Sequence, residues 1–181
     1  MPAMLLLAHF GARTFGRLAI AVTLESMDGD RSLVGNDAVL CDEIVSSLPY
    51  HFAEGNGRRE CAVAVRSEKG LVAVKAERPV GFLTFVPRFD QAAEITWMAV
   101  QADHRRQGIG RLLIESLVAH LRESSMRLVL VLTVSPNGDE DSPEDGYRAT
   151  RAFYGAMGFT LARDLHREWP NDVAVLMVRP L

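Results

Sequence analysis

The stretch Arg105-Arg106-Gln107-Gly108-Ile109-Gly110 follows a strand-like segment, Glu94-Ile-Thr-Trp-Met-Ala-Val100, and precedes an amphipathic stretch that begins at Arg111. Its two glycines let the backbone approach an anion closely. A helix that starts there directs unpaired N–H groups and the positive end of its dipole toward that anion. Three arginines around the glycines add positive charge. The segment therefore predicts a loop that holds a pyrophosphate.

The segments after this loop complete a strand-helix-strand unit. Apolar residues recur at helical spacing up to about Glu123, namely Ile109, Leu112, Leu113, Leu117 and Leu121. Residues 128–134 form a nearly continuous apolar run, which predicts a strand buried on both faces. Because a crossover helix joins parallel strands, the strands that end at Val100 and Val134 should lie parallel.

Further strands and helices are predicted before the loop. Three apolar segments separated by short polar turns, at 71–76, 80–86 and 93–100, predict an antiparallel meander. A first strand is predicted at 18–24, and a helix capped by Asn36 or Asp37 should end before Pro49. Residues 60–65 fit either a short helix or a strand, and we favour the helix.

An acidic loop, a short helix and a hairpin complete the chain. Residues 135–146 carry five acids and two prolines, which predicts an exposed, mobile loop. A helix over 147–157 should end at Gly158, and a hairpin should join strands at 159–169 and 173–178. On this helix Tyr147, Thr150, Arg151 and Tyr154 share one face, whereas Ala149, Phe153, Ala156 and Met157 share a neighbouring face that suits the core.

The composition is that of one folded domain. The 181 residues, 48% hydrophobic and 24% charged, suffice for one well-packed mixed α/β domain but hardly for two. We expect this domain to span 18–181, with 1–17 as an N-terminal extension or an early strand. A net charge of -3 argues against a partner that is a nucleic acid or a membrane surface.

Cysteine usage and glycine spacing exclude other classes. Cys41 and Cys61 are the only cysteines, too few for a disulfide scaffold, and no Cys/His cluster has zinc spacing. We therefore expect no metal site and a reducing, cytoplasmic location. A dinucleotide-binding fingerprint is poorly supported, because Leu113 stands where the third glycine would be.

Three motifs together resemble the GCN5-related N-acetyltransferase (GNAT) superfamily. They are Met98-Ala-Val100, the loop 105–110 and Ala152-Phe-Tyr-Gly-Ala-Met-Gly-Phe159. The family's loop pattern, Arg/Gln-x-x-Gly-x-Gly/Ala, is matched by Arg105, Gly108 and Gly110. Many members have glycine where this chain has Arg106. The order of elements extends the resemblance from about residue 18 to the end. It implies a mixed α/β fold whose mostly antiparallel sheet is splayed between two parallel strands and flanked by helices.

The resemblance also implies acetyl-CoA as the acyl donor, with no metal. In that family the strand before the glycine loop bulges and splays from the next parallel strand, which frees backbone groups. The backbone of Met98, Ala99 and Val100 would therefore meet the pantetheine arm and the acetyl carbonyl, with the Met98 N–H as the oxyanion contact. The remaining residues that the family pattern assigns to cofactor binding are Arg105, Arg106, Gln107, Gly108, Ile109, Gly110 and Arg111.

Two residues are candidates for proton transfer. The resemblance implies Tyr154 as the general acid, since a phenol with a pKa near 10 stays protonated at neutral pH; the alternative is a tyrosine that only packs on the sheet. Strand alternation would place Glu94, Thr96 and Met98 on one face, where the Glu94 carboxylate could take the amine proton. A cross-strand ion pair explains Glu94 equally well.

The acceptor implied by the resemblance is a primary amine of a small molecule or a peptide. It would enter between 49–57 and 135–146, where the acidic loop either steers a cation or is a solvated tip. The alternative function is a non-catalytic acyl-CoA-binding sensor or interaction module, in which Tyr154 only packs. A homodimer through the C-terminal strands is compatible with the family, and no residue fixes it.

Overall fold

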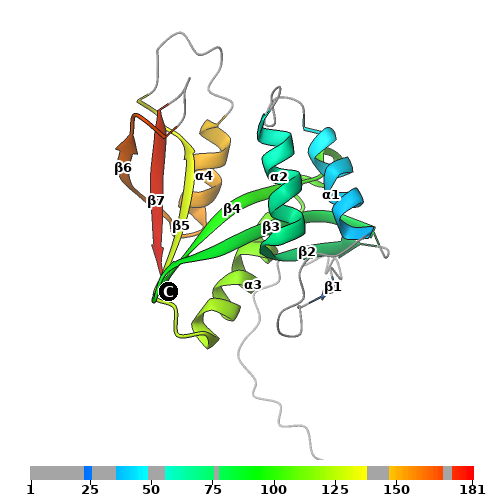
Figure 1. Ribbon diagram of the computed structural model, residues 1–181, viewed down its shortest axis with the longest axis horizontal. Helices are drawn as coiled ribbons and strands as arrows, with labels where there is room; N and C mark the ends of the chain where they lie inside the picture. The colour runs from blue at the N-terminus through cyan, green and yellow to red at the C-terminus, as the bar shows by residue number, and fades with distance from the viewer. Residues whose placement is uncertain (1–22, 26–35, 49–55, 76–77, 138–146, 169–172) are drawn as a thin grey trace, which may run out of the picture.

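A computed structural model of the chain describes residues 23–25, 36–48, 56–75, 78–137, 147–168 and 173–181. The elements in order are β1 (Thr23–Glu25), α1 (Asn36–Ser46), α2 (Asn56–Ser67), β2 (Lys69–Lys75), β3 (Arg78–Phe89), β4 (Ala92–Val100), a 3-10 turn (Ala102–His104), α3 (Ile109–Glu123), β5 (Leu128–Val134), α4 (Arg148–Ala156), β6 (Thr160–Leu165) and β7 (Ala174–Pro180). Seven described strands form one sheet in the order β1-β2-β3-β4-β5-β7-β6 (Figure 1).

The strand pairing confirms the expected mixed sheet. β2, β3 and β4 form the antiparallel meander, β4 and β5 are parallel, and β6 and β7 form the terminal hairpin. β1 covers the end of the first predicted strand, whose residues 18–22 lie outside the described part of the chain. Segments 1–17 and 138–146 also lie outside it, so the N-terminal extension, the single-domain boundary and the acidic loop stay predictions. The homodimer stays a prediction as well.

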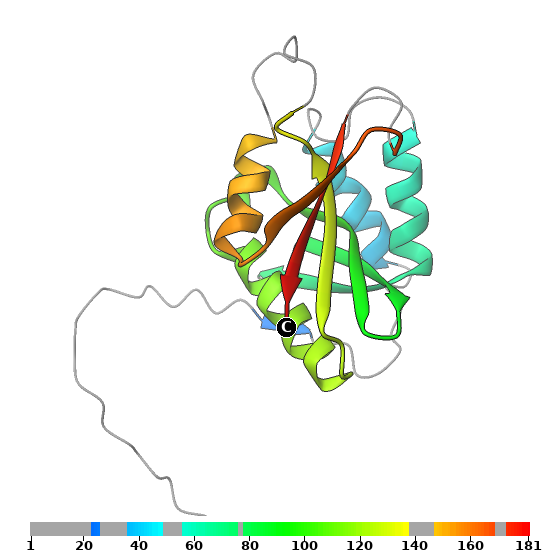
Figure 2. The same cartoon turned by 90° about the vertical axis from the view of Figure 1, so that its left-hand side faces the viewer.

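Helices cover the two faces of the sheet and enclose two apolar clusters (Figures 1 and 2). On one face, α1 and α2 pack over β2, β3 and β4 around buried Phe82 and Ala99. On the other face, α3 and α4 pack around Leu83 and Ile95, together with residues of β5 and β7. Each cluster removes apolar side chains from water, which is the main force that holds helices on a sheet.

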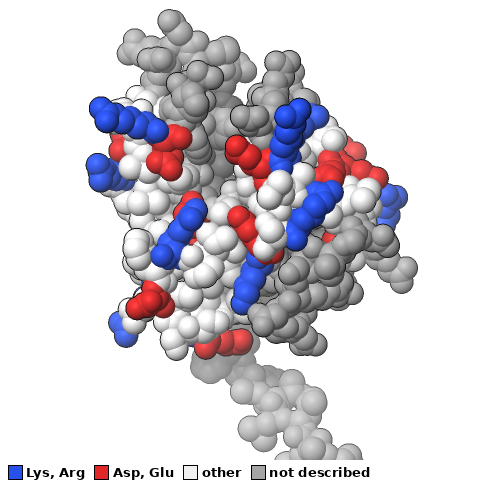
Figure 3. All heavy atoms as spheres, viewed as in Figure 1, with Lys and Arg blue, Asp and Glu red and all other residues white. Residues whose placement is uncertain are grey.

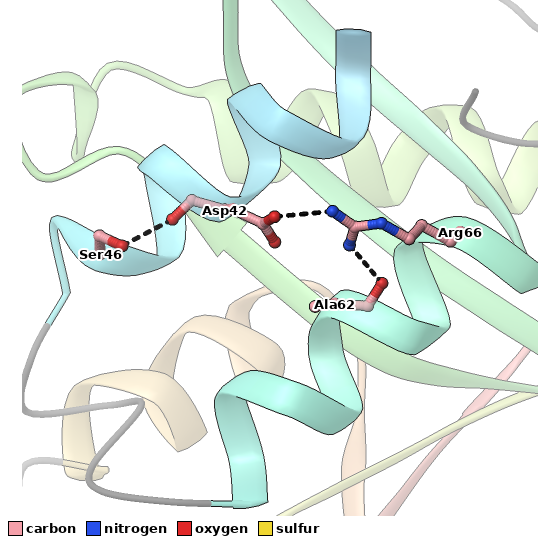
Figure 4. Close-up of polar contacts among 4 residues, drawn as sticks. All are labelled: Asp42, Ser46, Ala62 and Arg66. Atoms are coloured by element: carbon pink, nitrogen blue, oxygen red, sulfur yellow. Dashed lines mark hydrogen bonds and ion pairs between the residues drawn. The ribbon is translucent and has the colours of Figure 1, made fainter. Parts of the chain in front are cut away.

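The α1–α2 pair settles the ambiguity at 60–65 in favour of a helix. Cys61 and Val65 recur at helical spacing and are buried against α1, where Cys41 is also buried. Outside this contact Arg66 donates to the Asp42 carboxylate at 2.8 Å and to the Ala62 carbonyl at 2.6 Å (Figure 4). A six-residue pattern was too short to separate helix from strand, and the packing against α1 decides it.

A β-bulge interrupts β4 at Thr96. Trp97 pairs with Thr84, but the next pair joins Ile95 to Phe85, so Thr96 is an extra residue on the bulged strand. The alternation of side chains therefore changes at this point. Ile95 packs in the α3–α4 cluster, and so does Met98, whereas Trp97 packs in the α1–α2 cluster. The expectation that Glu94, Thr96 and Met98 share one face is wrong, because the bulge returns Met98 to the opposite side.

β5 is also less buried than its sequence suggests. Val129, Val131 and Thr133 are buried, but the alternate residues remain partly exposed, with Leu128 37% exposed. The prediction of a strand buried on both faces is wrong, because the helices that cover β5 lie on one face only (Figure 2). Composition alone cannot distinguish a fully buried strand from an apolar strand with one half-exposed face.

The parallel strands β4 and β5 diverge along their length (Figure 1). They pair only between Ala92–Ile95 and Leu128–Val131. Beyond this point β4 continues beside β3 and β5 continues beside β7. The β5-facing side of Thr96–Val100 therefore has no strand beside it among the described residues. Ligands of parallel sheets bind at the carboxyl ends of the strands, where this opening lies.

Candidate active site

The loop between β4 and α3 has the backbone geometry of an anion site. Gly108 precedes the first residue of α3 with φ 86°, a left-handed conformation that favours glycine. No side chain caps this helix start, so its first N–H groups are left for another partner. A Cβ built on Gly108 would meet no atom within 4 Å, which leaves open space over the loop. These features fit a bound phosphate group.

The side chains of the loop divide into exposed cations and structural residues. Arg105, Arg106 and Arg111 are exposed, and Arg106 has a positive φ of 59°. Gln107 instead accepts a hydrogen bond from Lys75 Nζ at 3.1 Å and donates to the Asp103 carbonyl at 2.9 Å. Its side chain therefore fixes the loop, and a role in cofactor binding would fall to its backbone.

Two further loop residues are tied to the core. Ile109 is 2% exposed, so its side chain packs in the core and its backbone alone faces the loop. Gly110 lies against both β4 and α4, because a Cβ there would meet the Phe153 ring at 3.1 Å and Met98 Cε at 3.3 Å. The start of α3, the end of β4 and the middle of α4 therefore meet at Gly110.

Tyr154 is buried at this meeting point. It is 6% exposed, and its hydroxyl donates to Sδ of Met98 at 3.8 Å. Its ring makes edge-to-face contacts with Phe153 and Phe159, each with centroids 5.3 Å apart. Burial raises the pKa of Tyr154 above its ordinary value, because a phenolate would lose its hydration. The hydroxyl therefore stays protonated, as a general acid requires.

Helix α4 spans the opening between the diverging strands. Tyr154 contacts β4 through Met98, and Arg151 donates to the Val134 carbonyl of β5 at 2.8 Å. The expectation that Ala149 and Ala156 belong to the core-facing side of this helix is wrong, since both residues are exposed. The helix is instead turned so that Tyr154 itself enters the core, which explains the direction of its hydroxyl.

Glu94 is engaged by a neighbouring strand. Arg88 Nε donates to Glu94 Oε2 in a close ion pair between β3 and β4. The Glu94 side chain is 15% exposed, compared with 48% for Arg88. The ion-pair interpretation of Glu94 is thus realised, and its role as a general base stays a prediction.

Thr133 is a candidate site residue that sequence reasoning missed. It lies on β5 beyond the last pair with β4, and its Oγ1 is buried without a hydrogen-bond partner among the described residues. A buried hydroxyl without a partner is costly, so this position fits a ligand that brings a polar group between the strands. The signal was a single threonine within the apolar run Leu128–Val134.

The face of the molecule that carries α1 and α2 has no dominant charge of one sign (Figure 3). Acidic and basic side chains are interspersed on this face. Among the described residues no group of His, Cys, Asp and Glu side chains could hold a metal ion. In the same part of the chain no helix is long and apolar enough to cross a membrane.

The diverging parallel strands, the uncapped helix start and the tyrosine helix across the opening agree with the acyltransferase fold that the resemblance implied. The sequence model described as "Acetyltransferase (GNAT) family" matches residues 39–159. The chain belongs to this family and is an N-acetyltransferase by class. A search of curated proteins found no match.

Solved structures share the fold at low sequence identity. A Desulfovibrio desulfuricans protein, described as a GNAT-family acetyltransferase, has 19% identity and a TM-score of 0.73 over 88% of this chain and 99% of that one. The ribosomal-protein-S18-alanine N-acetyltransferase of Escherichia coli has 20% identity and a TM-score of 0.66, with 87% and 92% covered. An aminoglycoside 6'-N-acetyltransferase complexed with coenzyme A has 13% identity and a TM-score of 0.64, with 87% and 96% covered.

Proposed function

We propose that this protein transfers an acetyl group from acetyl-CoA to a primary amine of a small molecule or peptide, by direct attack and without a covalent enzyme intermediate. The observation that supports this most strongly is the meeting of Gly110, Met98 and Tyr154 where β4 and β5 diverge. A loop whose geometry fits a phosphate, an unpaired strand edge and a buried hydroxyl thus lie together. The loop would hold a phosphorylated acyl donor, and the strand edge and the hydroxyl would serve the acyl transfer, which uses hydrogen-bond donors at the oxyanion and a proton for the leaving group.

The loop and the strand edge would hold the donor. The α3 N–H groups and the left-handed Gly108 fit its pyrophosphate, and Arg105, Arg106 and Arg111 supply positive charge around it. The backbone of Met98, Ala99 and Val100 would bind the rest along the opening. Bound acetyl-CoA supplies an acetyl group activated as a thioester. The structural relative that is complexed with coenzyme A supports this assignment.

Two proton transfers are needed: one to the departing sulfur, from Tyr154, and one from the attacking amine, to water or to Glu94. As the bond from the amine nitrogen to the carbonyl carbon forms and the carbon–sulfur bond breaks, the Tyr154 hydroxyl would give its proton to the departing sulfur. The Met98 N–H would stabilise the negative charge on the carbonyl oxygen. The amine loses its proton to water or to Glu94, which would have to share its carboxylate with Arg88. Solvent then restores the Tyr154 proton.

The alternative is a sensor that binds acyl-CoA without catalysis. The hydrogen bond from Tyr154 to Met98 favours it, because a tyrosine satisfied within the core can be purely structural. Thiol release from acetyl-CoA with a panel of primary amines separates the two functions. Amine-dependent release supports the transferase, whereas acetyl-CoA binding without release by any amine supports the sensor. A cytoplasmic location is part of the proposal, supported by the two buried free cysteines.

A further inference from the structure

A groove of about 340 Å³ runs between α2 and β4 on the face opposite Tyr154. Its apolar lining is formed by Val63 and Ala64 of α2 and by Trp97 of β4. Its charged lining is formed by Glu60, Glu68 and Arg59, so acids outnumber cations two to one. Val63 is 64% exposed, although it is an apolar residue on a well-packed helix. An exposed apolar surface beside carboxylates suits a ligand that is both apolar and cationic.

The β4 bulge creates the wall of this groove. Because Thr96 is the extra residue, Thr96 and Trp97 both face α2, where regular alternation would send one of them to the other side. Trp97 packs against the α1–α2 cluster, and Thr96 bonds to Glu68 at the end of α2. The same irregularity places Met98 on the Tyr154 side. The groove and the proposed acetyl site are therefore on opposite faces of adjacent residues.

A chain of hydroxyl groups holds the Glu68 carboxylate in place. Thr96 donates its only hydroxyl proton to Glu68 Oε2 in a close contact. Thr84 must therefore donate to Thr96, with the two oxygens 2.7 Å apart. Thr84 is completely buried within the sheet. The carboxylate is thus anchored from the sheet interior, which fixes a negative charge at one end of the groove.

The groove lies beside a part of β4 that does not pair with β5, because Trp97 follows the last paired residue, Ile95. α2 packs on β4, and its opposite side is held against α1 by the Arg66–Asp42 ion pair (Figure 4). The groove residues Glu60 and Ala64 lie along the other side of α2, and Glu68 follows the last residue of this helix. β5 no longer pairs with β4 beyond Ile95, and the strand edge at Met98 is the next residue after the groove wall at Trp97.

We propose that this groove binds the acceptor, and that it selects a primary amine carried on an apolar or aromatic body. The inference rests on the proposed transferase function and names the acceptor class. Val63 and Trp97 hold the apolar body. Glu68 attracts the protonated amine and positions it beside the strand edge. Polyhydroxylated amines and extended polyamines gain little from this apolar lining.

The test compares two primary amines that differ in their bodies, phenethylamine and ethanolamine. Steady-state thiol release is measured for the wild type, Val63→Lys and Glu68→Gln. We expect wild-type kcat/KM for phenethylamine to exceed that for ethanolamine by about tenfold or more. Glu68→Gln should raise the KM for phenethylamine about tenfold and leave kcat nearly unchanged, because it acts on amine binding. Val63→Lys should lower kcat/KM for phenethylamine by a similar factor.

Matched controls separate the groove from general effects. Val39→Lys adds the same charge at a valine of α1 that is 58% exposed and not part of the groove, and Glu123→Gln neutralises an exposed acid of α3. Neither control should change the preference between the two amines. Calorimetric affinity for acetyl-CoA should be the same in all variants, which shows that they remain folded.

Two results would overturn the proposal, and they differ in meaning. If ethanolamine is acetylated as well as phenethylamine, and Val63→Lys changes neither, the groove is not the acceptor site although the transferase function stands. If acetyl-CoA binds but no amine of either type releases thiol, both the groove assignment and the proposed function fail.

Discussion

The Tyr154 hydroxyl donates to Sδ of Met98 at 3.8 Å, which joins α4 to the end of β4. A thioether sulfur is a weak acceptor, so this proton can be redirected at little cost. Burial raises the pKa of Tyr154, which keeps the proton on the oxygen. The Tyr154 hydroxyl therefore remains a proton donor, and it lies beside the strand edge that is proposed to bind the thioester.

Replacing Tyr154 with phenylalanine removes this donor and keeps the ring contacts. We expect Tyr154→Phe to lower kcat by about 100-fold, the lower range for loss of a general acid, while the Kd for acetyl-CoA is nearly unchanged. Steady-state thiol release and calorimetry measure the two quantities. Tyr147→Phe, which removes a hydroxyl just before the same helix, is the control and should retain activity. Equal turnover by Tyr154→Phe and the wild type would reduce Tyr154 to a packing residue.

Two glycines of similar local structure should respond differently to alanine. A methyl group at Gly110 would meet the Phe153 ring at 3.1 Å, whereas at Gly155 it would meet nothing within 4 Å. We expect Gly110→Ala to lose about 1 kcal/mol of unfolding free energy through overpacking, and to weaken acetyl-CoA binding. Gly155→Ala should gain about 0.5–1 kcal/mol, because alanine restricts the unfolded chain. Denaturant unfolding measures both. A gain in both variants would show that Phe153 moves aside freely.

The cysteines should be inert in the folded protein. Burial raises the pKa of Cys41 and of Cys61 to about 12, so almost no thiolate is present at neutral pH. We expect an aromatic disulfide reagent to react with neither thiol under native conditions and with both in denaturant. Activity should also survive treatment of the native protein. Rapid native labelling of either cysteine would contradict the packing of α1 against α2.

The contact between Asp164 of β6 and the residues that follow β5 should weaken at acid pH. The Asp164 carboxylate accepts hydrogen bonds from Ser135 at 2.6 Å and from Asn137 at 2.8 Å, and these lower the pKa of Asp164. A lowered pKa in the folded state stabilises the protein above the unfolded pKa. This contribution is lost as pH falls below about 4 through the folded pKa. Carboxyl titration by NMR should show the pKa of Asp164 rising in Ser135→Ala. An unchanged pKa would contradict the contact.

The sequence predicted those parts of the candidate site that depend only on residues close together in the chain. The glycine loop and the start of α3 follow from residues within a few positions of one another, and Gly108 has the conformation that only glycine adopts readily. The parallel pairing of β4 and β5 follows from the crossover helix between them. These relationships need no knowledge of distant residues.

Relationships set by distant contacts could not be predicted. The resemblance implied a bulge in the strand before the glycine loop, but its position at Thr96 depends on how β4 pairs with β3, and no glycine or proline marks it. It reversed the expected side of Met98 and brought Thr96 to Glu68. The rotation of α4 that buries Tyr154 depends on its packing against Met98 and Phe159. Side-chain periodicity indicates which residues share a face, but it does not say which neighbour that face will meet.

Calorimetric titration with acetyl-CoA tests the central assignment most directly, on the wild type and on the pair Gly108→Asp and Gly108→Asn. Both substitutions place a side chain of similar size in the open space over the loop, and both residues tolerate a positive φ better than most. Only the aspartate adds negative charge. We expect the wild type to bind, Gly108→Asn to bind more weakly, and Gly108→Asp to lose binding while it remains folded. Equal affinity of all three proteins, or no binding by the wild type, would contradict an acyl-CoA site at this helix start.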